Sequence, residues 1–182
     1  KRVGRYLLKF PRLVYEFPFQ NSVEALDVYV DTDHAGCLRT RKSTSGGIVE
    51  FGNHVLKSWS ITQAVVALSS GEAEYYGIVR GSSVALGMKA MFIDLGIECN
   101  IRVKSDASAA IGIASRKGLG KVRHIELNQL WLQDKVQKKI IVLNKVESKK
   151  NKADALTKHV PAQELSFHCN ATHQHVMQDR HE

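Results

Sequence analysis

The chain has 182 residues, of which 43% are hydrophobic, so it can bury the core of one compact domain. No apolar run approaches the roughly 18 residues that cross a bilayer, and we expect no membrane association. The three cysteines lie far apart, which excludes a disulfide scaffold and favours a reducing, intracellular setting. The first methionine is Met88, so we expect a processed product or a piece of a longer polypeptide.

The formal net charge of +8 is concentrated in one part of the sequence. Residues 116–152 contain 11 Lys and Arg residues and only three acidic ones. A local basic surface of this kind is typical of proteins that bind polyanions. A solvated face without a ligand is the plainer interpretation, but the acidic residues described below favour nucleic acid.

The spacing of apolar residues and turn signals predicts a mixed α/β domain. The expected elements are, in chain order, a short basic helix at residues 3–10, strands at 25–31, 47–51 and 55–60, a long helix at 72–95, a strand at 101–105, helices at 107–115 and 125–137, a strand at 140–146, and a last helix opening at 151–158. The first three strands should form an antiparallel meander. Beyond Pro161 the periodicity is lost, and we expect a poorly packed tail.

Acidic residues stand at the ends of several expected elements. Asp31 ends the first strand of the meander, and Asp106 follows the strand at 101–105. Asp154 lies in the first turns of the last expected helix. Strand-to-helix junctions of α/β sheets gather at the carboxyl ends of the strands, where ligands usually bind.

The long helix adds a fourth acid, and its identity is left open by the pattern. Residues two positions apart lie about 200° apart around a helix, so only one of Glu72 and Glu74 can face the sheet. Glu74 shares a face with small or apolar residues such as Gly81 and Ala85, which suit close packing. The pattern favours Glu74 without deciding the matter.

Each of these acids, taken alone, is explained as well by helix capping or by a solvated surface. Four at matching junctions are poorly explained in that way, because clustered carboxylates repel one another unless a cation is present. Carboxylates and substrate phosphates are the ligands that Mg²⁺ prefers. The convergence therefore predicts a pair of divalent ions about 3.5–4 Å apart that serves phosphodiester hydrolysis.

Six motifs resemble, in order, the ribonuclease H domain of copia-type long-terminal-repeat retrotransposon polyproteins. They are YVDTDHAG at 29–36, RKSTSGG at 41–47, VALSSGEAEY at 66–75, KSDASA at 104–109, RHI at 123–125 and ADALTK at 153–158. The resemblance implies an α/β ribonuclease H-like fold. Its mixed five-stranded sheet has three antiparallel strands followed by two parallel ones, and helices flank it.

The resemblance also implies the site, the substrate and the partners. It makes Asp31, Glu74, Asp106 and Asp154 the catalytic metal ligands for two Mg²⁺ ions, or Mn²⁺. The substrate would be the RNA strand of an RNA/DNA hybrid. Residues 1–22 would be a connection after a reverse transcriptase domain, 23–160 the ribonuclease H domain, and 161–182 the tail. The setting would be cytoplasmic or a virus-like particle.

Hydroxyl and cationic side chains near the acids are candidate contacts to the nucleic acid. These predicted nucleic-acid contacts are Arg41, Lys42, Ser43, Thr44, Ser45, Ser70, Arg123 and His124. An ordinary hairpin loop at 41–45 is the alternative for the first five. The alternative functions are a catalytically inactive nucleic-acid-binding module and a fossil retroelement fragment.

Overall fold

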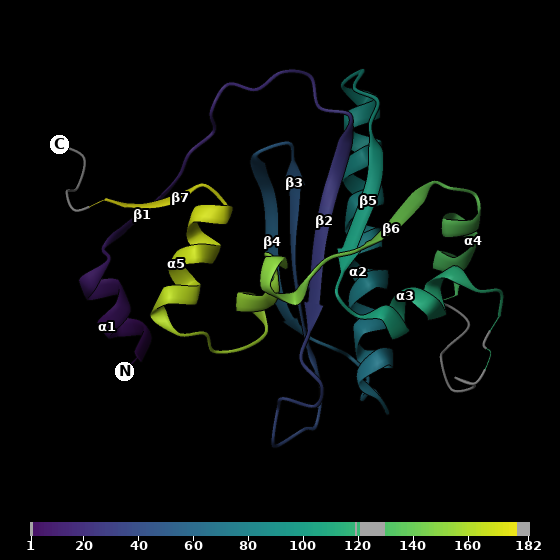
Figure 1. Ribbon diagram of the computed structural model, residues 1–182, viewed down its shortest axis with the longest axis horizontal. Coiled ribbons are helices and arrows are strands. Elements are labelled where there is room, and N and C mark those ends of the chain that lie inside the picture. Colours follow the sequence, from purple (N-terminus) through teal and green to yellow (C-terminus); the bar gives the residue numbers. More distant parts are fainter. Residues whose placement is uncertain (1, 119, 121–129, 178–182) are drawn as a thin grey trace.

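The computed structural model describes residues 2–118, 120 and 130–177 (Figure 1). In chain order its elements are α1 (Arg2–Lys9), β1 (Arg12–Tyr15), β2 (Ala25–Thr32), β3 (Thr44–Phe51), β4 (His54–Thr62), α2 (Ser70–Asp94), β5 (Asn100–Ser105), α3 (Ser108–Ser115), α4 (Trp131–Gln137), β6 (Ile141–Lys145), the 3₁₀ turns η2 (Ser148–Lys150) and η3 (Asp154–Leu156), α5 (Ala162–Ala171) and β7 (Gln174–Met177). None of the described helices combines the length and the apolarity needed to cross a membrane.

Five strands form the central sheet in the order β4-β3-β2-β5-β6. β2, β3 and β4 pair antiparallel, with a two-residue turn between β3 and β4 and a longer connection between β2 and β3, whereas β2–β5 and β5–β6 are parallel. The parallel pairs need crossover connections, which the helices between these strands supply. The predicted fold class, with three antiparallel strands followed by two parallel ones, is therefore confirmed.

Helix α2 packs against one face of the sheet, behind it in Figure 1, and its glycines allow a close approach. A Cβ atom at Gly81 would lie 2.6 Å from Val30 Cγ1, and one at Gly77 would lie 2.5 Å from Thr32 Oγ1. The order of these contacts shows that α2 runs antiparallel to β2. The first turns of α2 therefore lie at the carboxyl end of β2.

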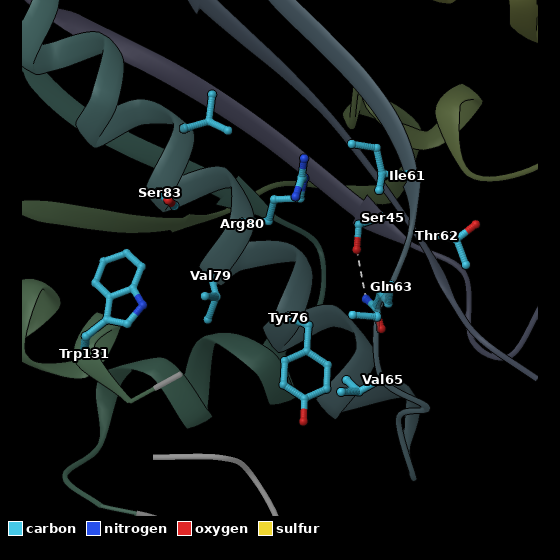
Figure 2. Close-up of a pocket in the computed structure, with 12 residues that line it drawn as sticks. Ser45, Ile61, Thr62, Gln63, Val65, Tyr76, Val79, Arg80, Ser83 and Trp131 are labelled. Carbon is cyan, nitrogen blue, oxygen red and sulfur yellow. Dashed lines mark hydrogen bonds between the residues drawn. The ribbon is translucent and has the colours of Figure 1, made fainter. Parts of the chain in front are cut away.

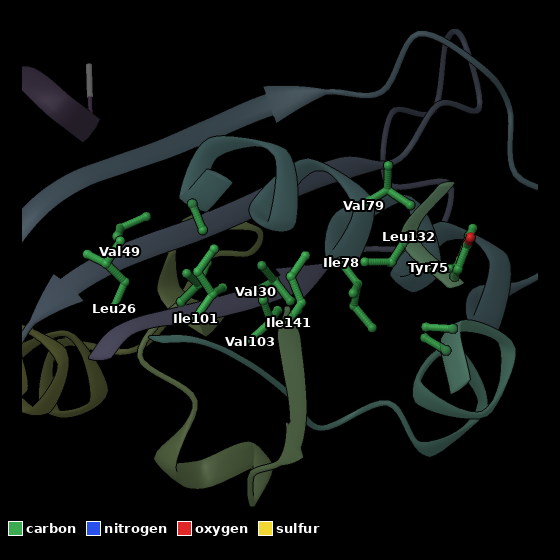
Figure 3. Close-up of a cluster of buried hydrophobic side chains, with 14 of the residues drawn as sticks. Leu26, Val30, Val49, Tyr75, Ile78, Val79, Ile101, Val103, Leu132 and Ile141 are labelled. Atoms are coloured by element: carbon green, nitrogen blue, oxygen red, sulfur yellow. The ribbon is translucent and has the colours of Figure 1, made fainter. Parts of the chain in front are cut away.

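The hydrophobic core fills the space between this face and the helices (Figure 3). It is formed by alternate residues of the central strands and by the inner sides of α2 and α4. Its fully buried members include Leu26, Val28, Val30, Val49, Tyr75, Ile78, Ile101, Val103, Leu132 and Ile141. Such a core of well-packed aliphatic side chains makes the sheet a rigid support for the residues at its edge.

The opposite face of the sheet is crossed by the segment 151–157, which was expected to open a helix. That expectation is wrong, because the segment forms only the single turn η3. The buried side chain of Asn151 donates a 2.9 Å hydrogen bond to the Val30 carbonyl, and Ser60 Oγ donates one of 2.6 Å to the Leu156 carbonyl. Hydrogen bonds between side chains and backbone carbonyl groups thus attach this segment to the sheet, in place of the backbone hydrogen bonds that a helix would have.

The tail after Pro161 also differs from expectation in its described part. It forms α5 and β7, and β7 pairs antiparallel with β1 in a separate two-stranded sheet at one side of the molecule (Figure 1). A contact of 2.9 Å between His175 Nε2 and Glu16 Oε2 adds to this pairing. The division of the chain at residues 22 and 160 stays a prediction, while β1 and β7 join the two outer segments.

Candidate active site

Three of the four predicted acids converge at the carboxyl end of β2. One carboxylate oxygen from each of Asp31, Glu74 and Asp106 lies within 4.8 Å of the other two. Asp31 comes from the end of β2, Glu74 from the second turn of α2, and Asp106 from the junction between β5 and α3. Among the described residues, this is the group of acidic, His or Cys side chains that can hold a metal ion.

Glu74 is the most perturbed carboxylate of the group. Burial, followed by the nearby charges of Asp31 and Asp106, raises the pKa of Glu74 to about 8. Its Oε2 atom is buried and has no hydrogen-bond partner among the described residues. A buried carboxylate oxygen without a donor is costly unless a proton or a cation neutralises it.

Asp31 is only 6% exposed, and its carboxylate binds the segment that crosses the sheet. The hydroxyl group of Thr157 donates a hydrogen bond to Asp31 Oδ2. Burial raises the pKa of Asp31 to about 6, although this hydrogen bond lowers it. The charges of Asp154 and Asp106 raise the pKa of Asp31 further, and Lys158 lowers it.

Asp154 lies beside the group of three but not within it. Its Oδ1 atom forms an ion pair with Lys158 Nζ, and the side chain of Asp154 is 14% exposed while that of Lys158 is 56% exposed. The hydrogen bond with Asp154 raises the pKa of Lys158. Thr157 and Lys158 stand in the ADALTK motif, but sequence reasoning did not assign them to the site. Their spacing from Asp154, three and four residues, was the available signal.

The donor atoms fit a hard divalent cation. They are carboxylate oxygens from rigid elements, they lie close enough to share an ion, and one of them has no other partner. The raised pKa values of Asp31 and Glu74 follow from burial and mutual repulsion, which a bound cation would offset. Asp31, Glu74 and Asp106 are thus the residues that could hold a metal, with Asp154 beside them.

Sequence comparison finds relatives of the chain among retrotransposon polyproteins. No protein-family model matches it. The Retrovirus-related Pol polyprotein from transposon TNT 1-94 of Nicotiana tabacum is 30% identical over 145 residues, which are 79% of this chain and 11% of the polyprotein. The corresponding polyprotein from transposon RE2 of Arabidopsis thaliana is 29% identical over 170 residues, 92% of this chain and 12% of that polyprotein. The chain thus spans only about a ninth of the length of these relatives.

Solved structures agree on the architecture. LC11-RNase H1, isolated from compost, superimposes with a TM-score of 0.51 at 17% identity over 74% of this chain and 93% of its own. The same enzyme in complex with an RNA/DNA hybrid gives a TM-score of 0.50 at 19% identity, covering 72% and 93%. The chain has the ribonuclease H fold, and its homologues are retrotransposon Pol polyproteins. The resemblance found in the sequence is thereby confirmed.

Two other acids near the site of this ribonuclease H-fold domain have structural roles. Glu72, left open as an alternative to Glu74, accepts hydrogen bonds from the Leu68 amide at 2.9 Å and from the Tyr76 hydroxyl at 2.8 Å. It therefore secures the start of α2, where Ser69 caps the helix by accepting from the Glu72 amide. Asp33 accepts from the Thr44 amide and closes the turn after β2.

The predicted nucleic-acid contacts divide into two groups in the ribonuclease H fold. Ser43 and Ser45 are buried, and their hydroxyl oxygens accept hydrogen bonds from the Ala35 amide and the Gln63 side chain. These contacts give the two serines structural roles. Arg41 and Ser70 are exposed, and Lys42 and Thr44 are partly exposed, so these residues stay predicted contacts. Arg123 and His124 lie outside the described residues.

A hollow of about 910 Å³ opens on the β4 side of α2 (Figure 2). Its lining includes Gln63, Tyr76, Arg80 and Trp131, and Arg80 is exposed. Ser45, which also lines it, is the register partner of Thr32 next to Asp31. The hollow thus reaches the end of the sheet that carries the acids.

Proposed function

We propose that this domain is a ribonuclease that hydrolyses the RNA strand of RNA/DNA hybrids during retrotransposon reverse transcription. The observation that supports it most is the convergence of Asp31, Glu74 and Asp106 at the carboxyl end of β2 in a ribonuclease H fold. The homology to Pol polyproteins supports the setting, and the hybrid bound to a structural neighbour supports the substrate.

Asp31, Glu74 and Asp106 would hold two divalent cations, Mg²⁺ or Mn²⁺, and Asp154 would complete the ligand set. Bound ions of this kind supply Lewis-acid activation of a water molecule and charge stabilisation at a phosphate. The chain itself contributes the rigid placement of three carboxylates from β2, α2 and the β5–α3 junction. It also contributes the Thr157 hydrogen bond, which fixes the orientation of Asp31.

Recognition of the hybrid would depend on its shape and on RNA 2′-hydroxyl groups, with little reading of bases. The excess of Lys and Arg in residues 116–152 supports contacts to phosphates. Arg41 and Lys42, in the turn before β3, would add cations near the acidic edge. Binding should therefore weaken steeply as the salt concentration rises.

The remaining proposals concern the setting of the domain. We propose that it works beside the reverse transcriptase domain of the same polyprotein, in the cytoplasm or in a virus-like particle. The Pol polyproteins to which it is homologous support the link to a reverse transcriptase.

A cleavage assay tests the proposed activity. An RNA/DNA hybrid labelled on the RNA strand is incubated with the domain and Mg²⁺, with the DNA duplex and double-stranded RNA as competing substrates. We expect cleavage of the RNA in the hybrid alone, and its loss on addition of EDTA. Binding of the hybrid without any cleavage would instead identify an inactive binding module.

Two variants control this assay. Asp106→Asn removes a charge from the acidic group and should abolish cleavage while the protein still binds the hybrid. Asp134→Asn removes a carboxylate from the exposed Asp134–Lys138 pair on α4 and should cleave like the wild type. Equal cleavage by the Asp106→Asn variant and the wild type would contradict the assignment.

A further inference from the structure

Lys158 places a positive charge beside the acidic group. Its Nζ atom forms an ion pair with Oδ1 of Asp154, whose side chain is largely buried, while the side chain of Lys158 is 56% exposed. The lysine follows Thr157, which is hydrogen-bonded to Asp31. The backbone at Lys158 is therefore held next to Asp31 as well as next to Asp154.

The charge of Lys158 also interacts with the three other acids. It lowers the pKa of both Asp31 and Glu74, and the charges of Asp31 and Asp106 act on Lys158 in return. The ammonium group thus interacts with all four acids that the proposed function assigns to metal binding. A surface lysine that pairs with a single aspartate would not interact with the other three acids.

We propose that Lys158 is a resident counter-ion of the acidic site, which pairs with Asp154 while no divalent cation is bound and releases it when one binds. This inference rests on the proposed metal-dependent function. The two cations would compete for the same negative charge, so that the lysine weakens metal binding and stabilises the metal-free protein.

The side chain of Lys158 suits such an exchange. Lysine carries its charge on a flexible four-carbon chain, and an ammonium group gives up a carboxylate for water at little cost when it is exposed. A divalent cation carries twice the charge and attracts carboxylates more strongly. Asp154 would then be free to turn toward the three other acids.

Metal titrations of three variants test the proposal. Lys158→Gln removes the charge, Lys158→Arg keeps it, and Lys138→Gln removes a lysine from an exposed pair with the same four-residue spacing on α4. Binding of Mn²⁺ is measured by calorimetry, and the melting temperature is measured in EDTA and in saturating Mn²⁺.

We expect Lys158→Gln to bind Mn²⁺ about fivefold more tightly than the wild type, which corresponds to the loss of one partly exposed ion pair. In EDTA this variant should melt at a lower temperature than the wild type, and in saturating Mn²⁺ the difference should vanish. Lys158→Arg and Lys138→Gln should bind Mn²⁺ like the wild type. If Lys158 had only a structural role, Lys158→Gln would lower the melting temperature equally in EDTA and in Mn²⁺.

Unchanged or weaker Mn²⁺ binding by a folded Lys158→Gln variant would overturn the counter-ion proposal. If that variant does not fold, nuclear magnetic resonance of the wild type decides: the ¹⁵Nζ signal of Lys158 should shift when Mg²⁺ is added, and a constant signal would overturn the proposal. Wild-type protein that binds Mn²⁺ and cleaves the hybrid leaves the proposed function intact in either case. Wild-type protein that binds no divalent cation would overturn both.

Discussion

The Thr157 hydroxyl group donates a hydrogen bond to Oδ2 of Asp31, although the two residues are separated by 126 positions. This contact joins the end of β2 to the segment that carries Asp154. It also favours the charged form of Asp31, against the effect of burial. The hydrogen bond from Thr157 thus helps to keep the buried Asp31 in its ionised form, which is the form that binds a cation.

Replacing Thr157 by Val should shift the pH dependence of cleavage. Without the hydrogen bond, the pKa of Asp31 should rise above about 6, so the acid limb of the pH–rate profile should move to higher pH by about one unit. Cleavage rates of the hybrid measured between pH 5.5 and 9 check this. Thr157→Ser keeps the hydroxyl group and should keep the wild-type profile, whereas an unmoved limb in Thr157→Val would contradict the role.

Substitutions at Glu72 and at Glu74 should have different effects: the first should lower stability, and the second should weaken metal binding. Glu72→Gln keeps one acceptor oxygen and places an NH2 group against the other of the two donors, Leu68 or Tyr76, so the free energy of unfolding should fall by about 1–3 kcal/mol. Divalent metal should still raise the melting temperature of this variant. Glu74→Gln should retain the stability of the metal-free protein and lose the metal-induced rise. Urea unfolding measures the stability, and melting curves measure the effect of metal. If Glu72→Gln lost the metal-induced rise and Glu74→Gln lost stability instead, the roles given to the two residues would be wrong.

The metal-free domain should lose stability as the pH rises. Folding raises the pKa of Glu74 to about 8 and that of Asp31 to about 6. The native state therefore holds more protons than the unfolded chain above about pH 4, and its stability falls as the pH rises through these two values. Urea unfolding in EDTA at pH 5 and pH 8.5 measures this. In Glu74→Gln the fall between pH 6.5 and 8.5 should shrink, and an unchanged fall would argue against Glu74 as its source.

Gly46 should be intolerant of any side chain. It pairs with Asp31 across β2 and β3, and a Cβ atom there would lie 2.8 Å from Leu156 Cβ and 2.9 Å from Thr157 Cγ2. Gly46→Ala should push the segment 153–157 off the sheet, lower stability by roughly 1–3 kcal/mol and reduce cleavage. Unfolding and cleavage assays measure both effects.

Gly87 supplies the matched control for that substitution. It lies in the interior of α2, and a Cβ atom there meets nothing within 4 Å. Gly87→Ala should raise stability by about 0.5–1 kcal/mol through helix propensity and leave cleavage unchanged. If both alanine variants behave alike, the contact between Gly46 and the segment 153–157 does not matter.

The central sheet and two of the three acids, Asp31 and Asp106, were predictable because their signals are local. Asp31 lies at the end of a strand and Asp106 directly after one, and Gly81 and Ala85 mark the packed face of α2. These patterns depend on burial of one face of an element, which is visible within a few residues. The family resemblance was needed to decide between Glu72 and Glu74 and to suggest the substrate and the partners.

Other features could not be read from the sequence because they depend on contacts between distant residues. The stretch Ala153–Lys158 has helical propensity, yet Asn151 and Thr157 bind β2 and hold the chain in a single turn. The strands β1 and β7 have four residues each, and neither has a pattern until the other lies beside it. Ser43 and Ser45 were predicted as contacts to nucleic acid, and their hydrogen bonds with Ala35 and Gln63 could not be read from the sequence.

The pairing of β1 with β7 determines which of the two sheets can form first. The whole central sheet lies between the two strands in the sequence, so β1 has no partner until the residues up to Met177 are present. Closing so long a loop costs least once the intervening residues are already compact. Of the strands that the structure describes, β1 should therefore pair with β7 only after the central sheet has formed.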